Sequence, residues 1–381
     1  MNALTTFDVG YDVPARPGDA LDTVQTPALV IDLDAFERNL ERLRAAADAM
    51  GVRLRPHAKT HKSADIARIQ MERGGACGIS CQKVSEAEAL VRAGIDDILV
   101  ANEVRDPAKL DRIGRLALEA RIILCVDDAE ALPDLARATS RHGSTLEVLV
   151  EIDCGAGRCG ISPGEPARDL ALRIAETPGL VFAGLQAYHG PAQHIADPSE
   201  RRAAIAKAVV STERTVSLLA EVGLSCAIVG GAGTGSFPLE GGSGVYNELQ
   251  CGSYVFMDAD YERVRTEDGG RPGGFENALF VLTSVMSRPA QGRAVCDAGL
   301  KSLSTDSGLP RVFDREGVAY VGVSDEHGSL SDPGDTLRVN DRIRLVPGHC
   351  DPTCNLHDWY VCVRNGRVEA LWPVTARGKS W

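Results

Sequence analysis

Hydrophobic residues follow two alternating spacings over the first two thirds of the chain. Residues 28–33 form a short apolar run with β-branched side chains, and residues 35–50 then place apolar side chains every three or four positions. The second spacing is that of an amphipathic helix. Gly51 follows, where a glycine commonly ends a helix. The pattern predicts a strand followed by a helix, a unit that the chain goes on to repeat.

Further strand-like runs begin at residue 52, and helix-like runs such as 84–93, 107–118 and 200–222 separate most of them. The strand-like runs are residues 52–54, 77–80, 98–101, 122–126, 146–152, 181–188, 227–229 and 253–257. This is the number of alternating units expected of a (β/α)8 TIM barrel. A doubly wound open sheet is the alternative, because it is built from the same unit.

The helical spacing is lost after about residue 269. Glycine-rich turns there separate strand-like runs at residues 279–285, 293–295, 319–323, 342–345, 359–363 and 367–371. We therefore predict an α/β protein with two domains. The first is a TIM barrel over residues 28–270, and the second is a C-terminal β domain over residues 271–381, joined by the N-terminal segment 1–27.

Composition narrows the choice of partners. The chain has 381 residues and a formal net charge of −12, which argues against nucleic-acid and anionic-membrane partners. It contains no run of roughly 20 apolar residues, and residues 1–17 show no apolar signal region. The 11 cysteines are therefore expected to be reduced thiols of a cytoplasmic protein. Cys350 and Cys354 have no second pair at zinc-ribbon spacing, so a four-cysteine zinc site is not expected.

A lysine lies in the loop that follows the first predicted barrel strand. This residue, Lys59, lies in the sequence Arg-Pro-His-Ala-Lys-Thr-His-Lys. An amine reacts readily with an aldehyde when burial or nearby cations lower its pKa. The neighbouring basic residues Arg55, His57, His61 and Lys62 are expected to lower it. Most lysines are solvated surface charges, so this interpretation depends on the motifs that follow.

A glycine-rich loop, Gly-Gly-Ala-Gly-Thr-Gly-Ser at residues 230–236, directly follows the seventh predicted strand. Glycines let backbone N–H groups converge on an anion, and Thr234 and Ser236 add hydroxyl donors. Barrel enzymes often bind phosphate after the seventh and eighth strands. A second turn, Cys-Gly-Ser-Tyr at residues 251–254, offers the Tyr254 hydroxyl as a further contact. An isolated glycine run is more often a flexible loop, and that remains the alternative.

Other strand ends place polar side chains at the same mouth. Gln82 and Lys83 end the second predicted strand, Arg158 follows the fifth, and Tyr188 ends the sixth. Arg158 can lie beside a cofactor ring, or it can form a salt bridge with an acidic neighbour. Tyr188 can pack against a planar cofactor, or it can belong to the core.

The third motif is Pro-Gly-His-Cys-Asp-Pro in the β domain. In an extended segment, residues two positions apart point to the same side, so His349 and Asp351 are expected to reach one ion. An imidazole and a carboxylate suit Mg, Mn or Zn, with the remaining positions open to water or substrate. A hydrogen-bonded His–Asp pair without metal is the alternative.

Together and in this order, the motifs resemble the pyridoxal-phosphate (PLP) enzymes of fold type III. The group in question contains D-threonine aldolase, D-serine dehydratase and 3-hydroxyaspartate aldolase. The resemblance covers nearly the whole chain. Its motifs are Thr-Pro-Ala from Thr26, the Lys59 segment, Glu-Ile-Asp from Glu151 with Arg158, the loop from Gly230, Cys-Gly-Ser-Tyr from Cys251, and His-Cys-Asp from His349.

The resemblance implies an alanine racemase-like barrel with a β domain and PLP held as a Schiff base by Lys59. It implies a divalent metal, Mg or Mn with Zn as a third choice, at His349 and Asp351. It also implies a homodimer whose active sites are completed by the partner subunit. The remaining cofactor-binding residues are expected to be Gln82, Arg158, Tyr188, Thr234, Gly235, Gly252, Ser253 and Tyr254.

Residues 250–261 and 346–355 are most similar to 3-hydroxyaspartate aldolases, and Asp351 stands where dehydratases typically have a cysteine. We therefore expect a metal-dependent aldolase that reversibly cleaves 3-hydroxyaspartate to glycine and glyoxylate. His194 is a candidate base, or else an ordinary loop residue. Alternatives are a D-threonine aldolase, a dehydratase of the same family, a racemase, or a PLP carrier, which would resemble the barrel alone. Candidate donors for the second substrate carboxylate are Gln82, Lys83, His194 and Lys301.

Overall fold

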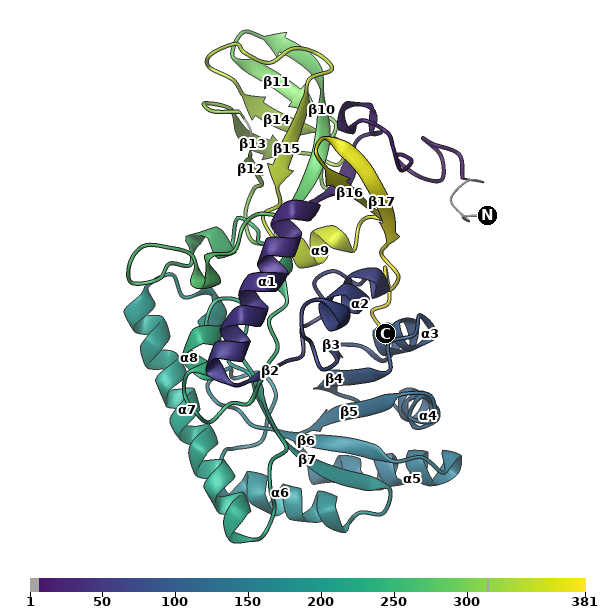
Figure 1. Ribbon diagram of the computed structural model, residues 1–381, viewed down its shortest axis with the longest axis vertical. Coiled ribbons are helices and arrows are strands. Elements are labelled where there is room, and N and C mark those ends of the chain that lie inside the picture. Colours follow the sequence, from purple (N-terminus) through teal and green to yellow (C-terminus); the bar gives the residue numbers. More distant parts are fainter. Residues whose placement is uncertain (1–6, 314) are drawn as a thin grey trace.

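The computed structural model describes residues 7–313 and 315–381, which are organised by two sheets (Figure 1). The first is a parallel sheet of eight strands in the order β2-β9-β8-β7-β6-β5-β4-β3. Parallel bridges from Leu54 to Ala76 and from His57 to Ser80 join β2 to the chain beside β3, so backbone pairing continues around the curled sheet. The predicted (β/α)8 barrel is confirmed, and the open doubly wound sheet is excluded.

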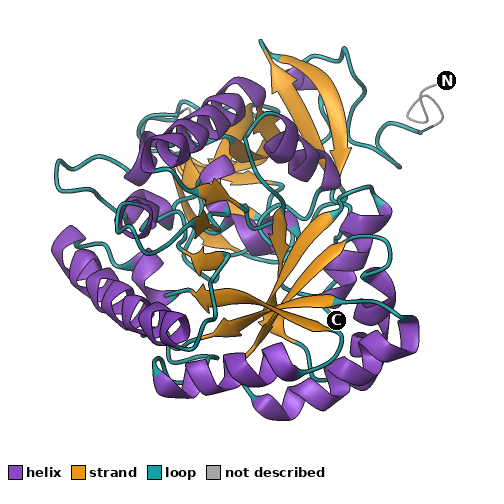
Figure 2. Cartoon of the chain, turned by 60° about the horizontal axis from the view of Figure 1, so that its bottom comes forward, coloured by secondary structure: helices purple, strands orange, loops and turns teal. Residues whose placement is uncertain are grey.

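Helices surround the barrel strands on the outside (Figure 2). The strands are β2 (Arg53–Leu54), β3 (Ile79–Cys81), β4 (Asp97–Glu103), β5 (Arg121–Val126), β6 (Leu146–Glu151), β7 (Leu180–Ala187), β8 (Ile228–Gly231) and β9 (Glu248–Leu249). The helices are α2 (Ala64–Glu72), α3 (Val84–Arg92), α4 (Pro107–Leu116), α5 (Leu132–His142), α6 (Glu165–Glu176), α7 (Pro198–Glu221) and α8 (Phe237–Gly241).

Both faces of the barrel strands are buried. In β4, Ile98 and Val100 pack outward against helices, whereas Leu99 and Ala101 belong to a separate cluster with Ile123 and other interior side chains. Successive residues of a strand point to opposite faces, so residues 98–101 of this strand are apolar on both faces. This explains why the barrel strands are recognisable as continuous apolar runs.

The eighth strand is not where the sequence predicted it. The run at residues 253–257 is not a strand; residues 253–255 form a turn of 3-10 helix, and the eighth strand is β9. Tyr254, Val255 and Phe256 are apolar because they lie in the core beneath α1 (Leu33–Met50), not because they pair in a sheet. A strand of two residues is too short to show a period, so the longer neighbouring run was mistaken for it.

The second sheet forms the β domain, in the order β13-β14-β11-β10-β1-β16-β17, with β15 joining β10 to β12. Its pairings are antiparallel except that β1 and β16 are parallel. Its strands are β1 (Ala28–Asp32), β10 (Leu279–Ala290), β11 (Arg293–Cys296), β12 (Arg311–Val312), β13 (Ala319–Val323), β14 (Gly328–Ser331), β15 (Arg342–Val346), β16 (Trp359–Arg364) and β17 (Arg367–Pro373), and its short helix is α9 (Cys350–Cys354).

The N-terminal part of the chain contributes to the β domain. The strand β1, which the prediction grouped with the barrel, pairs with β10 and β16. Val13, Ala15 and Val24 pack in one apolar cluster with side chains of β16 and β17. Residues 1–6 of the predicted joining segment lie outside the described residues, and the exact domain boundaries stay a prediction.

Helix α1 connects the two sheets, running from the β domain to the barrel (Figure 1). Asp32 caps its start by accepting hydrogen bonds from the backbone of residues 34 and 35, and Gly51 ends it with a left-handed backbone. Phe36 packs near the ring of Trp372 in β17, with centroids 5.8 Å apart. One apolar cluster includes side chains from both sheets, so the barrel and the β domain share a core. Within the described residues, no helix combines the length and the apolar character needed to cross a membrane.

Candidate active site

A cavity opens at the carboxyl ends of the barrel strands, where the loops carry most of the predicted site residues. The predicted residues in its lining are Lys59, Gln82, Arg158, Tyr188, Thr234, Gly252 and Ser253. They come from the loops after six different strands. The closed order of the barrel brings these loops to one mouth, which is where barrel enzymes bind their ligands.

The side chain of Asp351 connects the barrel lysine to the β-domain histidine. Its Oδ2 atom lies 3.6 Å from Lys59 Nζ, and its Oδ1 atom lies 4.0 Å from His349 Nε2. His349 Nδ1 in turn lies 2.7 Å from Asp306 Oδ2. The predicted cofactor lysine and the two predicted metal ligands therefore meet, although they come from different sheets.

The expected lowering of the Lys59 pKa is wrong in this structure. The Asp351 carboxylate raises that pKa, because a nearby negative charge favours the ammonium form, and it outweighs the opposing effect of burial. Of the predicted basic neighbours, His57 stays close, with its Nδ1 3.4 Å from the Lys59 backbone nitrogen. The others contact different partners: Arg55 contacts Glu248 and Asp97, His61 contacts Gln70, and Lys62 contacts Glu86.

The segment that carries the predicted metal ligands is not extended throughout. β15 ends at Val346, His349 is the N-cap residue of α9, and Asp351 lies in the first turn of that helix. The prediction of two alternating strand residues is therefore wrong about the backbone. The two side chains still approach each other, because a barrel residue fixes the start of the helix: Asp258 Oδ2 accepts a hydrogen bond of 2.9 Å from the Cys350 backbone.

The geometry of His349 and Asp351 fits a divalent ion on two grounds. Two ligand atoms that each lie about 2.1 Å from one ion can be at most about 4.2 Å apart, and the observed separation is 4.0 Å. A metal-binding histidine also usually donates its other ring N–H to a carboxylate, and Asp306 accepts such a bond from His349. With two protein ligands, the other coordination positions would be left for water or substrate.

Small residues form a cradle on the barrel side of the cavity. A Cβ atom added at Gly233 would lie 2.6 Å from Gln193, and one at Gly252 would lie 2.5 Å from Thr60 Oγ1, so neither position has room for a side chain. Within the described part of the chain, the buried Thr234 hydroxyl has no hydrogen-bond partner. A buried donor of this kind is costly unless a ligand satisfies it. The cradle therefore fits the phosphate of PLP.

Two predicted cofactor-binding residues, Tyr254 and Gly235, are not among the residues that line the cavity. The Tyr254 hydroxyl is buried and accepts a hydrogen bond of 3.1 Å from the Gln70 amide, so its side chain is held in the core. The Gly235 backbone N–H donates to Gln193 Oε1 at 3.2 Å. Ser236, a further hydroxyl of the loop, donates to Glu240 at 2.7 Å. The cavity wall is therefore formed by Thr234 and the turn at residues 252–253.

Arg158 forms the salt-bridge contact that was its alternative, and it also lies beside the ring of Tyr188, while a contact with a cofactor ring stays a prediction. Its guanidinium carbon lies 5.9 Å from the centre of the Tyr188 ring, and one of its nitrogens lies 3.8 Å from Glu151 Oε1. Burial, reinforced by Glu103, raises the pKa of Glu151. Gln82 lines the same side, with its amide nitrogen 3.0 Å from His57 Nε2. These contacts place a cation and an aromatic ring next to each other at the cavity wall.

His194 ends a short 3-10 helix, Pro191–His194, in the loop after β7. Its ring packs on Tyr261, which lines the cavity, with centroids 5.4 Å apart. Its Nδ1 atom lies 2.5 Å from Asp260 Oδ2. Burial lowers the pKa of His194, and the charges of His349 and Lys59 add to that effect. His194 is nevertheless a loop residue whose side chain is 48% exposed, so its role as a base stays a prediction.

Several lining residues were not predicted. Gln186 is the last residue but one of β7 and Gln250 follows β9, and each donates its amide to the other at 2.8 Å. A glutamine at the end of an apolar strand is a signal that the sequence offered. Tyr261 offered no such signal. Lys301, a predicted donor for the substrate, is exposed and contacts Glu326 in the β domain.

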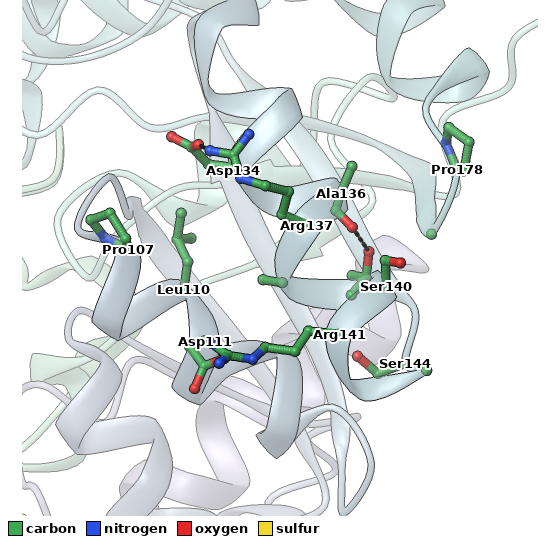
Figure 3. Close-up of a pocket in the computed structure, with 14 residues that line it drawn as sticks. Pro107, Leu110, Asp111, Asp134, Ala136, Arg137, Ser140, Arg141, Ser144 and Pro178 are labelled. Carbon is green, nitrogen blue, oxygen red and sulfur yellow. Dashed lines mark hydrogen bonds and ion pairs between the residues drawn. The ribbon is translucent and has the colours of Figure 1, made fainter.

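Two other features lie outside this set. Glu103, Asp127 and Cys159 bring ligand atoms within 4.8 Å of one another at the ends of β4, β5 and β6. A wider groove runs along α4 and α5, where Arg137 pairs with Asp134 and Arg141 with Asp111 (Figure 3). None of the predicted site residues lines that groove.

Comparison with known proteins supports the same interpretation. Residues 31–260 match the alanine racemase N-terminal domain, and residues 278–363 match the serine dehydratase domain. The chain is 52% identical to the 3-hydroxy-D-aspartate aldolase of Paracoccus denitrificans (strain Pd 1222), over 100% of both chains. It is 48% identical to the D-threonine aldolase of Arthrobacter sp, over 96% of both.

A solved structure agrees with these relatives. The crystal structure of D-threonine aldolase from Filomicrobium marinum matches with a TM-score of 0.93 and 51% identity, covering 97% of this chain and 100% of that chain. The predicted resemblance is confirmed, and family membership implies PLP as the cofactor. The chain therefore belongs to the fold type III family of PLP enzymes that contains the D-threonine aldolases, the 3-hydroxyaspartate aldolases and the D-serine dehydratases.

Proposed function

We propose that the protein is a metal-dependent aldolase that cleaves 3-hydroxyaspartate to glycine and glyoxylate, and that the reaction is reversible. The observation that carries this proposal is the position of Asp351, which contacts the amine of Lys59 through one oxygen and faces His349 through the other. An amine for the cofactor and a metal pair for the substrate are thus side by side. The full-length identity of 52% to a 3-hydroxy-D-aspartate aldolase supports the substrate.

Each group of residues has a separate task in this proposal. PLP, when bound, withdraws electrons from the substrate Cα and so makes the Cα–Cβ bond breakable. Lys59 holds the cofactor through Nζ, and Thr234 and Ser253 bind its phosphate at the cradle. His349 and Asp351 would hold the divalent ion, whose charge would lower the pKa of the 3-hydroxyl. His194 accepts the proton of that hydroxyl.

The second carboxylate of 3-hydroxyaspartate needs its own donors. Lys301 is the weakest of the predicted donors, since it is exposed and paired in the β domain. Gln82 lines the cavity, and Lys83 is the next residue of the same loop. Charged hydrogen bonds of this kind contribute about 1.5–3 kcal/mol each, or about 10- to 150-fold in preference over D-threonine, which lacks that carboxylate.

We further propose a homodimer in which the partner subunit completes each active site, in a cytoplasmic protein. The Lys59 side chain is 40% exposed in the single chain, whereas a reacting amine is better protected from water. Analytical ultracentrifugation of the holoenzyme tests this assembly, and a monomer with full activity would contradict it.

The function is tested by product analysis on purified holoenzyme with PLP and Mg or Mn. We expect glycine and glyoxylate from 3-hydroxyaspartate, and a kcat/KM at least about 10-fold above that for D-threonine. A higher value for D-threonine would make the protein a D-threonine aldolase, which its 48% identity to such an enzyme makes the second candidate. Ammonia and a keto acid as products would make it a dehydratase.

A further inference from the structure

We infer that Asp260 assigns His194 its role, by holding one ring nitrogen so that the other is a proton acceptor. This inference rests on the proposed function, because it concerns the proton of the 3-hydroxyl. The sequence left two roles for His194: a base for the hydroxyl, or a donor to the second carboxylate. The two roles need opposite states of the nitrogen that meets the substrate.

The contact between the two side chains decides which state is present. His194 Nδ1 lies 2.5 Å from Asp260 Oδ2, and a carboxylate can only accept, so Nδ1 carries the hydrogen and donates it. In a neutral imidazole the other nitrogen, Nε2, then has a free lone pair. Arg263 contacts Oδ1 of the same carboxylate and balances its charge, so Asp260 does not require a second cation from His194.

Asp260 is itself held firmly relative to the metal pair. It is buried, and its backbone N–H donates to the Gly348 carbonyl at 3.2 Å. The preceding residue, Ala259, donates to the Pro347 carbonyl at 3.0 Å. The barrel segment that carries Asp260 therefore runs along the β-domain segment that carries His349. This pairing fixes the distance between the histidine base and the metal site.

The loop that carries His194 is held as well. The guanidinium of the buried Arg201 donates to the Ile195 carbonyl at 2.6 Å and also to the Arg265 carbonyl. It thereby ties the loop after His194 to the chain that follows Asp260. Both members of the pair are thus anchored, as expected when a residue must orient a reacting side chain and not merely neutralise a charge.

The pair of His349 and Asp306 has the same arrangement, a ring Nδ1–H donated to a carboxylate. His349 Nδ1 donates to Asp306, which leaves Nε2 for the ion, and His194 Nδ1 donates to Asp260, which leaves Nε2 for a proton. An outer carboxylate that orients an imidazole typically changes activity by about 10–100-fold when it is removed. Asp260 is therefore a positioning residue, and His194 is the residue that touches the substrate.

A spectroscopic measurement tests the assignment without turnover. In nitrogen and carbon NMR spectra of the histidine rings, the His194 signals, identified by their loss in His194→Ala, should show the neutral form with hydrogen on Nδ1. In Asp260→Ala the hydrogen should move to Nε2. Wild-type His194 with hydrogen on Nε2, or on both nitrogens, would overturn the inference. That measurement needs only the wild-type protein and His194→Ala, so it decides the question even if the Asp260 variant does not fold.

A double-mutant cycle provides the kinetic test. We expect Asp260→Ala to lower kcat by about 10–100-fold with little change in KM, and His194→Ala to lower it by about 10²–10⁴-fold. The double variant should be no worse than His194→Ala, because Asp260 acts through that ring. Equal Asp260 effects in both backgrounds, or a change mainly in KM, would overturn the inference.

The chain offers a matched control in the pair of His142 and Asp111, whose atoms lie 3.0 Å apart in the groove between α4 and α5. Asp111→Ala should alter the His142 ring signals and leave kcat unchanged. A loss of kcat in this control as large as in Asp260→Ala would overturn the inference. Failure of the proposed function would look different: the wild type would release no glycine from 3-hydroxyaspartate, while the cycle could be measured with any 3-hydroxy amino acid that it cleaves.

Discussion

The barrel and the β domain contribute to the site through different kinds of structure. On the barrel side, the ends of many repeated strands surround one cavity, and its polar residues come from separate loops. On the β-domain side, His349 and Asp351 both lie at the start of α9, as its N-cap residue and in its first turn. We expect the barrel side to hold the cofactor and to supply the base His194, and the β-domain side to hold the metal that assists bond cleavage. The comparison teaches that the two tasks are separable by mutation.

The most damaging change on the barrel side should be the loss of Lys59. Lys59→Ala removes the covalent anchor, so we expect kcat to fall by at least about 1000-fold and the visible absorbance of the bound cofactor to disappear. Borohydride reduction of the wild type followed by peptide mapping should place the cofactor on Lys59. The control is Lys62→Gln in the same loop, whose amine contacts Glu86. Label on Lys62 or Lys83 would contradict the assignment.

On the β-domain side, removing the metal should spare the cofactor. A chelator, or His349→Ala, should lower kcat by at least about 100-fold, because a metal stabilises the developing charge by several kcal/mol. The cofactor spectrum and the unfolding temperature should stay almost unchanged, since two ligands do not hold a domain together as a four-ligand site does. Loss of the cofactor on chelation would show that the two sides are not separable.

Two barrel hydroxyls, those of Thr234 and Tyr254, are expected to affect different properties: cofactor affinity and core stability. Thr234→Val should raise the cofactor dissociation constant by about 10- to 150-fold, because one charged hydrogen bond of about 1.5–3 kcal/mol is lost. Tyr254→Phe is the matched control, since its hydroxyl contacts Gln70 in the core. We expect it to cost about 1 kcal/mol of stability and to leave the cofactor affinity unchanged. Titration with PLP measures the cofactor affinity of both variants. A lower affinity in Tyr254→Phe would support the prediction that the Tyr254 hydroxyl contacts the phosphate.

The smallest effect on catalysis should come from Glu240, behind the glycine loop. Burial raises the pKa of this carboxyl from 4.5 to about 7 in the folded protein. Ionisation of this buried carboxyl therefore lowers the free energy of unfolding. The loss is absent below about pH 4.5 and complete above about pH 7, where it reaches about 3 kcal/mol. Glu240→Gln removes it.

Urea unfolding of the apoprotein tests this prediction. The gain in unfolding free energy from Glu240→Gln should be about 2–3 kcal/mol larger at pH 8 than at pH 5. An equal gain at both values of pH would mean that the carboxyl is not protonated in the folded state. Turnover should change little, because Glu240 does not line the cavity.

The sequence predicted the barrel better than the segment at α9 that carries His349 and Asp351. The longer barrel strands are mostly apolar on both faces, and glycines such as Gly51 and Gly143 end helices with left-handed backbones, so local patterns located most elements. The exceptions are short: β9 has two residues, and its apolar neighbours were taken for the strand. The segment of His349 and Asp351 was expected to be extended, because the sequence does not indicate the hydrogen bond that the Cys350 backbone N–H donates to Asp258 at the start of α9.

For the site, too, the sequence identified some features and missed others. The sequence identified Lys59, Thr234, His349 and Asp351 as residue types suited to their roles. It did not determine their partners, and so it gave the Lys59 pKa the wrong direction: the nearest charge is Asp351, which lies far along the chain and comes from the other sheet. A pKa depends on charges within a few ångströms, and those are set by the fold and not by the neighbours in sequence.

By itself the sequence determined the strand–helix repeat, the glycine cradle and the residue types of the site, because periodicity, backbone freedom and donor chemistry are local properties. Tertiary structure alone decided that β1 joins the β domain, that Tyr254 faces Gln70, and that Asp260 holds His194. These outcomes depend on pairing and packing between segments that are far apart in the sequence. Such contacts stabilise the protein only after folding has brought the segments together. The site is assembled by those long-range contacts.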